Sequence, residues 1–383
     1  MKIPDGWAKV KFGDVVNKIN DKVPNREEWS FDKFIGGEHF DEGEIRVTRS
    51  APIAGNEEVI GSAFHMRFKP GHVLYVTRNP RLRKGGMVDF EGVCSNVSFV
   101  MQTDETKLLQ SLLPFIIQTE DFVKHTNNNA HGSTNPFLNW KDIAKYEFIL
   151  SPLEEQKKIS EALWAIEENI KYLEIYLDKF KKYKKRMHIK LYTDLNTKFI
   201  LFKEIIQLKK GKKPQFTYSE KKEGCIPYIN TDYLRIGRIN SYATPDNKIV
   251  LIEDEDIILL WDGSNAGEIL TGKKGILSST MAKIFFDDKK YDKQFVYYFL
   301  SLYESHIKMS CQGTGIPHID RIIIEKLKFP ILDLKKQKEI YKVLVMLDKY
   351  EDRIICVLKN SRNFRNKFSN ELLSGKLKLG AKK

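Results

Sequence analysis

Apolar residues recur at alternating spacings of four and three over residues 159–180, which is the heptad pattern of a helix that pairs with another helix. The pattern runs through Ile159, Leu163, Ile166, Ile170, Leu173, Leu177 and Phe180; Lys184 takes the next position, and Met187 and Leu191 resume it. We therefore expect one long helix over residues 152–193. Because such a helix cannot bury its apolar seam alone, the pattern also predicts a partner helix.

A second and less regular seam supplies that partner. It runs through Ile340, Leu344, Leu347, Ile354, Leu358, Phe364, Phe368 and Leu372. Glu351 stands where an apolar residue is expected. We expect a helix over residues 333–374 that packs against the first as an antiparallel coiled coil, and the alternative is that each helix belongs to a separate bundle.

The chain repeats itself at a fixed offset that carries Pro136 to Pro317. The same offset relates Phe148 to Phe329, Gln156 to Gln337, Ile159 to Ile340 and Leu163 to Leu344. Upstream of each helix, strand-like runs also correspond: 10–16 with 200–206, 71–78 with 256–263, and 92–101 with 275–286. A constant offset over so many positions predicts two copies of one structural unit.

Each copy combines strand-like runs, polar loops and a long helix, so the fold class that we expect is a mixed α/β (α+β) fold with an internal pseudo-two-fold repeat. The expected domains are a globular domain at residues 1–150, a long helix at 151–195, a second globular domain at 196–330 and a second long helix at 331–383.

Composition narrows the class of protein. The 383 residues are 42% hydrophobic and 30% charged, as in globular proteins, and the net charge is +13. Such an excess of cations favours a polyanionic partner such as nucleic acid, although a merely basic protein is the alternative. The N-terminus lacks the apolar stretch of a secretory signal, and no run approaches the length of a membrane span. Four scattered cysteines without a CxxC pair favour the reducing cytoplasm.

Motifs that carry chemistry are absent from the sequence. There is no G-x-x-x-x-G-K-[ST] loop, and the Gly313-x-Gly315 tripeptide runs into Pro317 instead of continuing as a dinucleotide fingerprint. Asn135-Pro136-Phe137 lacks one proline of the amino-methyltransferase motif. Asp287-x-Lys289 could pair with Pro245-Asp246 as a nuclease motif, but the spacing is long and the lysine lies in a DDKK cluster typical of a solvated turn. The eight histidines form no metal-ligand pattern. We therefore expect that the chain has no catalytic residues and no metal ligands, and that it is a binding protein.

Three stretches together match one known family: SPLEEQKKISEALWAIEENIKYLE (151–174), PDGWAKVKFGDVV (4–16) and KPGHVLYVTRNPRLRKGG (69–86). In these stretches the sequence resembles the specificity subunit of type I restriction–modification systems. The second helix departs from this motif, since Leu334-Lys335-Lys336-Gln337 replaces Leu-Glu-Glu-Gln. The resemblance covers essentially the whole chain.

This resemblance implies a non-catalytic reader of double-stranded DNA. Each globular domain would be a target-recognition domain for one half of a split sequence, and the helices would set the spacer and dock two modification subunits. S-adenosylmethionine would then be bound by those partners and no cofactor by this chain, and restriction or translocase subunits would join the complex. Two alternatives are a DNA-binding methyltransferase or nuclease with an unrecognised active site, and a coiled-coil scaffold without a DNA role.

Candidate DNA contacts are loop residues with hydrogen-bonding or cationic side chains. In the first domain they are Arg78, Asn79, Arg81, Arg83, Lys84, Asn128, His131, Ser133 and Thr134. In the second domain they are Lys210, Lys212, Lys213, Ser264, Asn265, Gln312 and Thr314.

Overall fold

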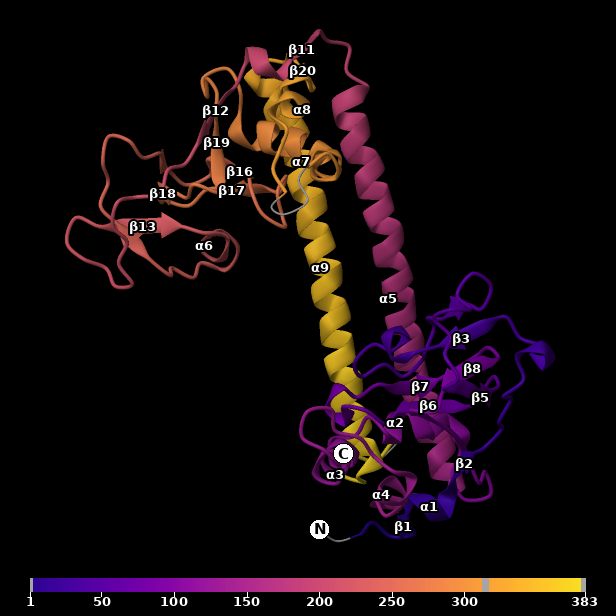
Figure 1. Cartoon of the computed structure of the whole chain (residues 1–383). Coiled ribbons are helices and arrows are strands. Elements are labelled where there is room, and N and C mark those ends of the chain that lie inside the picture. The colour runs from indigo at the N-terminus through magenta and orange to yellow at the C-terminus, as the bar shows by residue number, and fades with distance from the viewer. Residues whose placement is uncertain (1–2, 312–316, 380–383) are drawn as a thin grey trace. The chain divides into compact units, whose positions relative to one another are not determined.

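The computed structural model describes residues 3–311 and 317–379, and these form two compact units (Figure 1). Unit 1 contains Met1–Ile175 and Ile355–Lys383, and unit 2 contains Tyr176–Ile354. The two long helices α5 (Leu153–Thr193) and α9 (Leu334–Leu373) each contribute residues to both units. Their bounds lie within one residue of those expected from the heptad seams.

Unit 1 contains three small sheets. One pairs β1 (Ala8–Lys11) with β10 (Glu147–Leu150). The second has the order β2-β9-β6-β7, formed by β2 (Val16–Ile19), β9 (Ser98–Thr103), β6 (Val73–Val76) and β7 (Gly85–Met87). The third has the order β4-β3-β8-β5, formed by β4 (Ala51–Pro52), β3 (Lys33–Ile35), β8 (Gly92–Ser95) and β5 (Phe64–Phe68). Within this third sheet, β3 and β8 run parallel.

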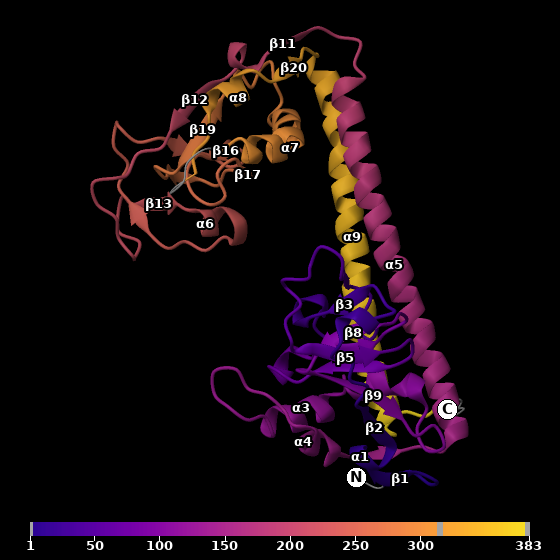
Figure 2. The same ribbon diagram turned by 45° about the vertical axis from the view of Figure 1, so that its right-hand side comes forward.

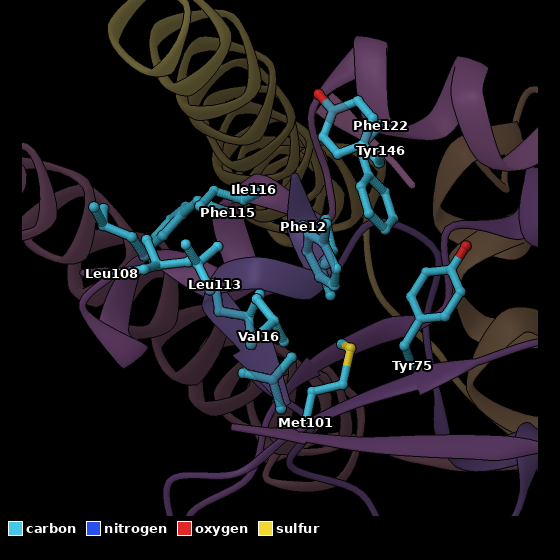
Figure 3. Packing of buried hydrophobic residues seen from close by; sticks show 14 of the residues in the cluster. Phe12, Val16, Tyr75, Met101, Leu108, Leu113, Phe115, Ile116, Phe122 and Tyr146 are labelled. Carbon is cyan, nitrogen blue, oxygen red and sulfur yellow. The ribbon is translucent and has the colours of Figure 1, made fainter. Parts of the chain in front are cut away.

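Short helices complete unit 1: α1 (Phe12–Val15), α2 (Leu113–Ile116), α3 (Glu120–Asn128) and α4 (Trp140–Ala144). Aromatic side chains fill the core between them, and Figure 3 shows Phe12, Tyr75, Phe122 and Tyr146 turned toward one another. The Phe122 ring lies 5.4 Å from Phe12 and meets Tyr146 edge-on at 5.1 Å, a geometry that aromatic pairs favour.

Unit 2 repeats this topology strand for strand. Its pair is β11 (Phe199–Leu201) with β20 (Lys328–Pro330). The order β12-β19-β16-β17 comprises β12 (Gln207–Lys210), β19 (Met281–Phe285), β16 (Ile257–Leu260) and β17 (Ile269–Thr271). The order β14-β13-β18-β15 comprises β14 (Tyr242–Ala243), β13 (Ile226–Ile229), β18 (Gly275–Leu277) and β15 (Leu251–Ile252), with β13 and β18 parallel. The helices are α6 (Thr231–Ile236), α7 (Lys293–Met309) and α8 (Arg321–Glu325). The predicted internal repeat and mixed fold class are confirmed.

Helices α5 and α9 lie side by side and antiparallel within each unit, as both Figure 1 and Figure 2 show. In unit 1, Glu167 pairs with Arg365, and Glu174 pairs with Arg362. As the residue number rises along α5, that of its partner falls along α9. The predicted antiparallel pairing is therefore confirmed.

The two polar interruptions of the heptad seams meet in unit 2. Lys184 of α5 donates hydrogen bonds to Glu351 and, at 2.7 Å, to Asp348 of α9. Burial alone would lower the pKa of Lys184, but these carboxylates raise it above its ordinary value. The lysine and the glutamate that break the apolar pattern thus neutralise each other across the helix pair.

A buried glutamine fixes the start of each long helix. Gln156 accepts a hydrogen bond from Leu109 N (2.9 Å) and donates to the carbonyls of Lys107 and Ser151 (both 2.8 Å). Gln337, at the repeat-related position, accepts from Asp292 N (2.8 Å) and donates to the carbonyls of Lys290 and Leu332 (both 2.8 Å). Both side chains are fully buried. The repeated glutamine therefore joins each globular domain to its helix.

Candidate nucleic-acid interface

Part of the candidate set lies at corresponding strand ends of the two units. In unit 1, Thr77 follows β6; its amide donates to Val97 O (2.8 Å) and its carbonyl accepts from Leu138 N (3.1 Å). In unit 2, Trp261 follows β16 and makes the same two bonds, to Thr280 O (2.8 Å) and from Ile319 N (3.2 Å). Because these contacts join the ends of different strands, they define one equivalent edge in each unit.

At this edge in unit 1, Arg78 and Asn79 lie beside the loop of residues 131–137. Arg78 forms an antiparallel bridge with Phe137, and Asn79 N donates to Pro136 O at 2.7 Å. The Asn79 side chain donates to Asn135 Oδ1 at 2.8 Å. Asn79 has a φ of 51°, a left-handed conformation that asparagine tolerates better than most residues. The structure therefore brings these two candidates together with the loop.

The loop of residues 131–137 is a tight hairpin. His131 and Phe137 exchange backbone hydrogen bonds of 2.8 and 2.9 Å, and His131 Nε2 lies 2.9 Å from Asp142 Oδ2. Ser133 and Thr134 are exposed at its tip. Asn128, the last residue of α3, is also exposed. Hydroxyl and amide groups presented in this way can donate to and accept from a nucleic acid.

Of the other cations of the same loop, Arg83 and Lys84 are engaged within unit 1. Arg83 makes a bidentate pair with Glu120 at 2.8 and 2.7 Å, which holds the pKa of Glu120 below its ordinary value. Lys84 Nζ donates to Gly37 O at 2.6 Å. Arg81 is exposed and lines a polar cleft of about 600 Å³ together with Arg46 and Gln118. The side chains of Arg81, Arg83 and Lys84 therefore do not join those of Arg78 and Asn79 beside the hairpin.

The same cleft contains Glu44, and burial raises the pKa of this carboxyl to about 8. Asp41 adds repulsion, while Arg49 and Lys84 act in the opposite direction. Since the folded-state pKa lies above the unfolded value, the stability contribution is fully present below pH 4.5 and is lost as the pH rises toward 8. We expect Glu44→Gln to flatten this loss. Thermal unfolding at pH 5.5 and 8.5 tests it, with exposed Glu42→Gln as the control; equal pH slopes for wild type and Glu44→Gln would contradict it.

The unit 2 candidates occupy the matching edge. Lys210, at the end of β12, donates to Asp262 Oδ2 at 2.6 Å, and exposed Ser264 and Asn265 follow in the same turn. Lys212 and Lys213 are exposed beyond Gly211. A Cβ at Gly211 would meet Ser278 O at 2.2 Å, so only glycine allows this close approach. Gln312 and Thr314 lie outside the described residues.

Three further residues at the unit 1 edge were missed by the sequence reasoning. Lys18, Asn96 and Asn139 line a hollow of about 330 Å³ together with Arg78 and Phe137. Lys18 Nζ lies 4.7 Å from the Phe99 ring centroid, and Asn96 is exposed in the turn between β8 and β9. Lys18 lies within β2, Asn96 follows β8, and Asn139 precedes α4 as its N-cap, so the three share no sequence signal beyond being polar.

Within residues 3–311 and 317–379, no group of three or more His, Cys, Asp or Glu side chains is arranged to hold a metal ion. Over the same residues, no helix has the length and apolar character needed to cross a membrane. All four cysteines are free.

Comparisons with known proteins agree with this geometry. A family model, the type I restriction modification DNA specificity domain, matches residues 4–177 and again 196–360. The MjaVIII specificity subunit of a type I restriction enzyme from Methanocaldococcus jannaschii is 47% identical over 145 residues, which is 38% of this chain and 34% of that protein. A putative MjaX specificity subunit from the same organism is 25% identical over 63% of this chain and 62% of its own length. The chain thus spans about one third and somewhat under two thirds of these two relatives.

Solved structures show the same fold at low identity. A chain from work on complex assembly and conformational transition of the type I R-M system has a TM-score of 0.68 at 14% identity, and the match covers 98% of this chain and 100% of that one. The HsdS subunit from Thermoanaerobacter tengcongensis has a TM-score of 0.51 at 14% identity, with 98% and 99% covered. Since the family model matches both copies of the repeat, the chain belongs to the type I restriction–modification DNA specificity family.

Proposed function

We propose that this chain is the DNA-specificity subunit of a type I restriction–modification complex and is not itself a catalyst. Residues 1–150 and 196–330 would be its target-recognition domains, each reading one half of a bipartite duplex target. Residues 151–195 and 331–383 would set the spacer between the halves. The observation that carries this proposal is the duplicated edge, where one backbone frame presents polar and cationic side chains twice in one chain.

The electrostatics support a nucleic-acid partner. The net charge is +13, and exposed Arg78, Lys212 and Lys213 lie at the two edges. Cations in such positions increase the affinity of a protein for duplex DNA, because their contacts with phosphates release condensed counterions. The hydroxyl and amide groups of Ser133, Thr134 and Asn265 add the donors and acceptors that base edges require.

The partners follow from the family. The complex would include two modification subunits, which bind S-adenosylmethionine and methylate the target, and restriction or translocase subunits. The helix pair would dock the modification subunits, and this chain would bind no cofactor. A complex that acts on cellular DNA would operate in the cytoplasm.

Exchanging residues 1–150 for the corresponding domain of a relative with another target is expected to change only one half of the methylated sequence. The reciprocal exchange of residues 196–330 should change only the other half, because each edge belongs to one unit. The measurement is a map of methylated bases in DNA from cells that express the chain with its modification subunit. If one exchange altered both halves, the assignment of one half to each domain would be wrong.

The same preparation tests the two alternative functions. Methylation or cleavage by the purified chain alone, with S-adenosylmethionine or a divalent cation, would identify an enzyme instead of a specificity subunit. A complex that never binds duplex DNA would indicate a scaffold. Under the proposal, the isolated chain is inactive and the complete complex methylates one defined sequence.

A further inference from the structure

The internal repeat allows a comparison of the two edges residue by residue. Arg78 follows Thr77, and Asp262 follows Trp261, in the same backbone frame. Arg78 bridges to Phe137 and Asp262 to His318, both antiparallel. The next residues, Asn79 and Gly263, both have positive φ and donate their amides to Pro136 O (2.7 Å) and Pro317 O (3.0 Å). Arg78 and Asp262 are therefore structural equivalents.

The frame is kept between the copies while this side chain changes. The proline that accepts the hydrogen bond is present in both units, and the buried residue two positions after it is Leu138 in unit 1 and Ile319 in unit 2. Between these conserved contacts, however, unit 1 has the cation Arg78 where unit 2 has the anion Asp262. The backbone is the same in both units whichever charge stands at this position, so the fold requires neither charge. Such a difference is expected if the two domains recognise different DNA sequences.

The two side chains also differ in what they contact. The Arg78 guanidinium is exposed and makes no ion pair or side-chain hydrogen bond with any residue that the structure describes. Its backbone is nevertheless fixed, because Thr77 Oγ1 donates to Val97 O at 2.8 Å and Asn79 is bound to the hairpin. Asp262 instead accepts a hydrogen bond of 2.6 Å from the Lys210 ammonium. Unit 1 thus presents an unpaired guanidinium, a planar fork of N–H donors, from a fixed backbone position. Unit 2 has no such group at the equivalent position.

Such a fork matches the two acceptors of guanine in the major groove, O6 and N7, which arginine can engage together. A phosphate is the competing target, since arginine also binds phosphate bidentately. Here the hollow beside Arg78, with Asn96 and Asn139 on its wall, provides further base-edge donors and acceptors within reach of the same site. Lys18 on the same wall supplies a cation for a neighbouring phosphate, while the fixed Arg78 backbone and the two neutral amides favour a base as the target of Arg78 itself.

We propose that Arg78 is a specificity-determining residue that reads a guanine in the half-site bound by unit 1, and that the Asp262–Lys210 pair replaces this guanidinium contact in unit 2. This inference rests on the proposed function. It predicts that the half-site of unit 1 contains a guanine that depends on this one side chain.

The test is the complete complex carrying Arg78→Ala, Arg78→Lys or the control Arg49→Ala, an exposed arginine of unit 1 that pairs with Asp41. The methylated sequence is mapped and binding is measured on targets with each base at every position. Arg78→Ala should accept other bases at one guanine position of one half-site, with about 5- to 150-fold loss of discrimination there. Arg78→Lys should be intermediate, because lysine keeps the charge without the fork. Arg49→Ala should leave every base preference unchanged.

The possible outcomes distinguish failure of the guanine contact from failure of the proposed function. An unchanged sequence preference in Arg78→Ala, whether binding is kept or falls equally on all targets, overturns the reading of a guanine and indicates a phosphate contact or none. Loss of discrimination in Arg49→Ala as well would equally overturn the special role of Arg78. A wild-type complex that shows no preferred sequence at all would instead refute the proposed function.

Discussion

Replacing Arg365 by alanine is expected to destabilise unit 1 by about 3–5 kcal/mol. Arg365 and Glu167 are buried, with side chains only 5% and 9% exposed, and their ion pair measures 2.8 Å. Arg365 Nη2 also donates to Gly43 O at 2.9 Å, which ties the globular domain to α9. The alanine variant would leave the Glu167 carboxylate buried without its partner, and that desolvation cost dominates the loss.

A surface pair on the same two helices provides the matched control. Arg362 and Glu174 are 51% and 44% exposed, so Arg362→Ala should cost less than about 1 kcal/mol. The double variant Glu167→Leu/Arg365→Met should recover most of the stability, because it removes both buried charges together. Chemical denaturation with hydrogen exchange in unit 1 measures all three. Equal losses for Arg365→Ala and Arg362→Ala would show that the buried pair contributes no more than the exposed one.

The long helices could be predicted from the sequence because their signal is local and repeated. Ile159, Leu163 and Ile170 follow the seam and are buried as expected. What the heptads did not reveal was why Lys184 and Glu351 interrupt them. These residues lie on different helices, and only the antiparallel register brings the two together into one ion pair.

The strand topology was accessible only in part. The repeat paired residues 71–78 with 256–263, and the structure places β6 and β16 at corresponding positions. No periodicity indicates that β3 lies parallel to β8 or that β9 lies between β2 and β6, since such pairings join segments far apart in sequence. Sheet order is a property of tertiary packing that short strands with weak patterns do not encode locally.

Candidate contacts were the least predictable part. Arg78, Arg81 and Arg83 look alike in sequence, yet Arg81 and Arg83 line one polar cleft, Glu120 binds Arg83 there, and Arg78 lines a different hollow. The separation arises from two non-glycine residues with positive φ, Asn79 and Arg83, which turn the loop twice. Such turns depend on contacts with the hairpin and α3, so residue type alone could not distinguish the three arginines.

Replacing Gln156 by leucine is expected to cost unit 1 about 3–5 kcal/mol, and Gln337→Leu should cost unit 2 a similar amount. Leucine has a similar volume but leaves one amide and two carbonyls without the partners that the glutamine provides. Each unsatisfied buried group costs about 1–3 kcal/mol, and the effects combine at one site.

The two variants are controls for each other because they remove the same joint from different units. Hydrogen exchange should accelerate at residues 105–112 and 151–160 in Gln156→Leu, and at residues 288–296 and 331–341 in Gln337→Leu. If either variant left its own unit protected, or loosened both units equally, the glutamine would not be a local joint. Because the side chain binds the first turn of the helix and the loop of the globular domain at once, its loss should free the domain from the helix before the heptad seam itself opens. The repeated glutamine thus adds a polar joint between globular domain and helix to the apolar contacts that Ile159 and Leu163 make in unit 1 and Ile340 and Leu344 make in unit 2.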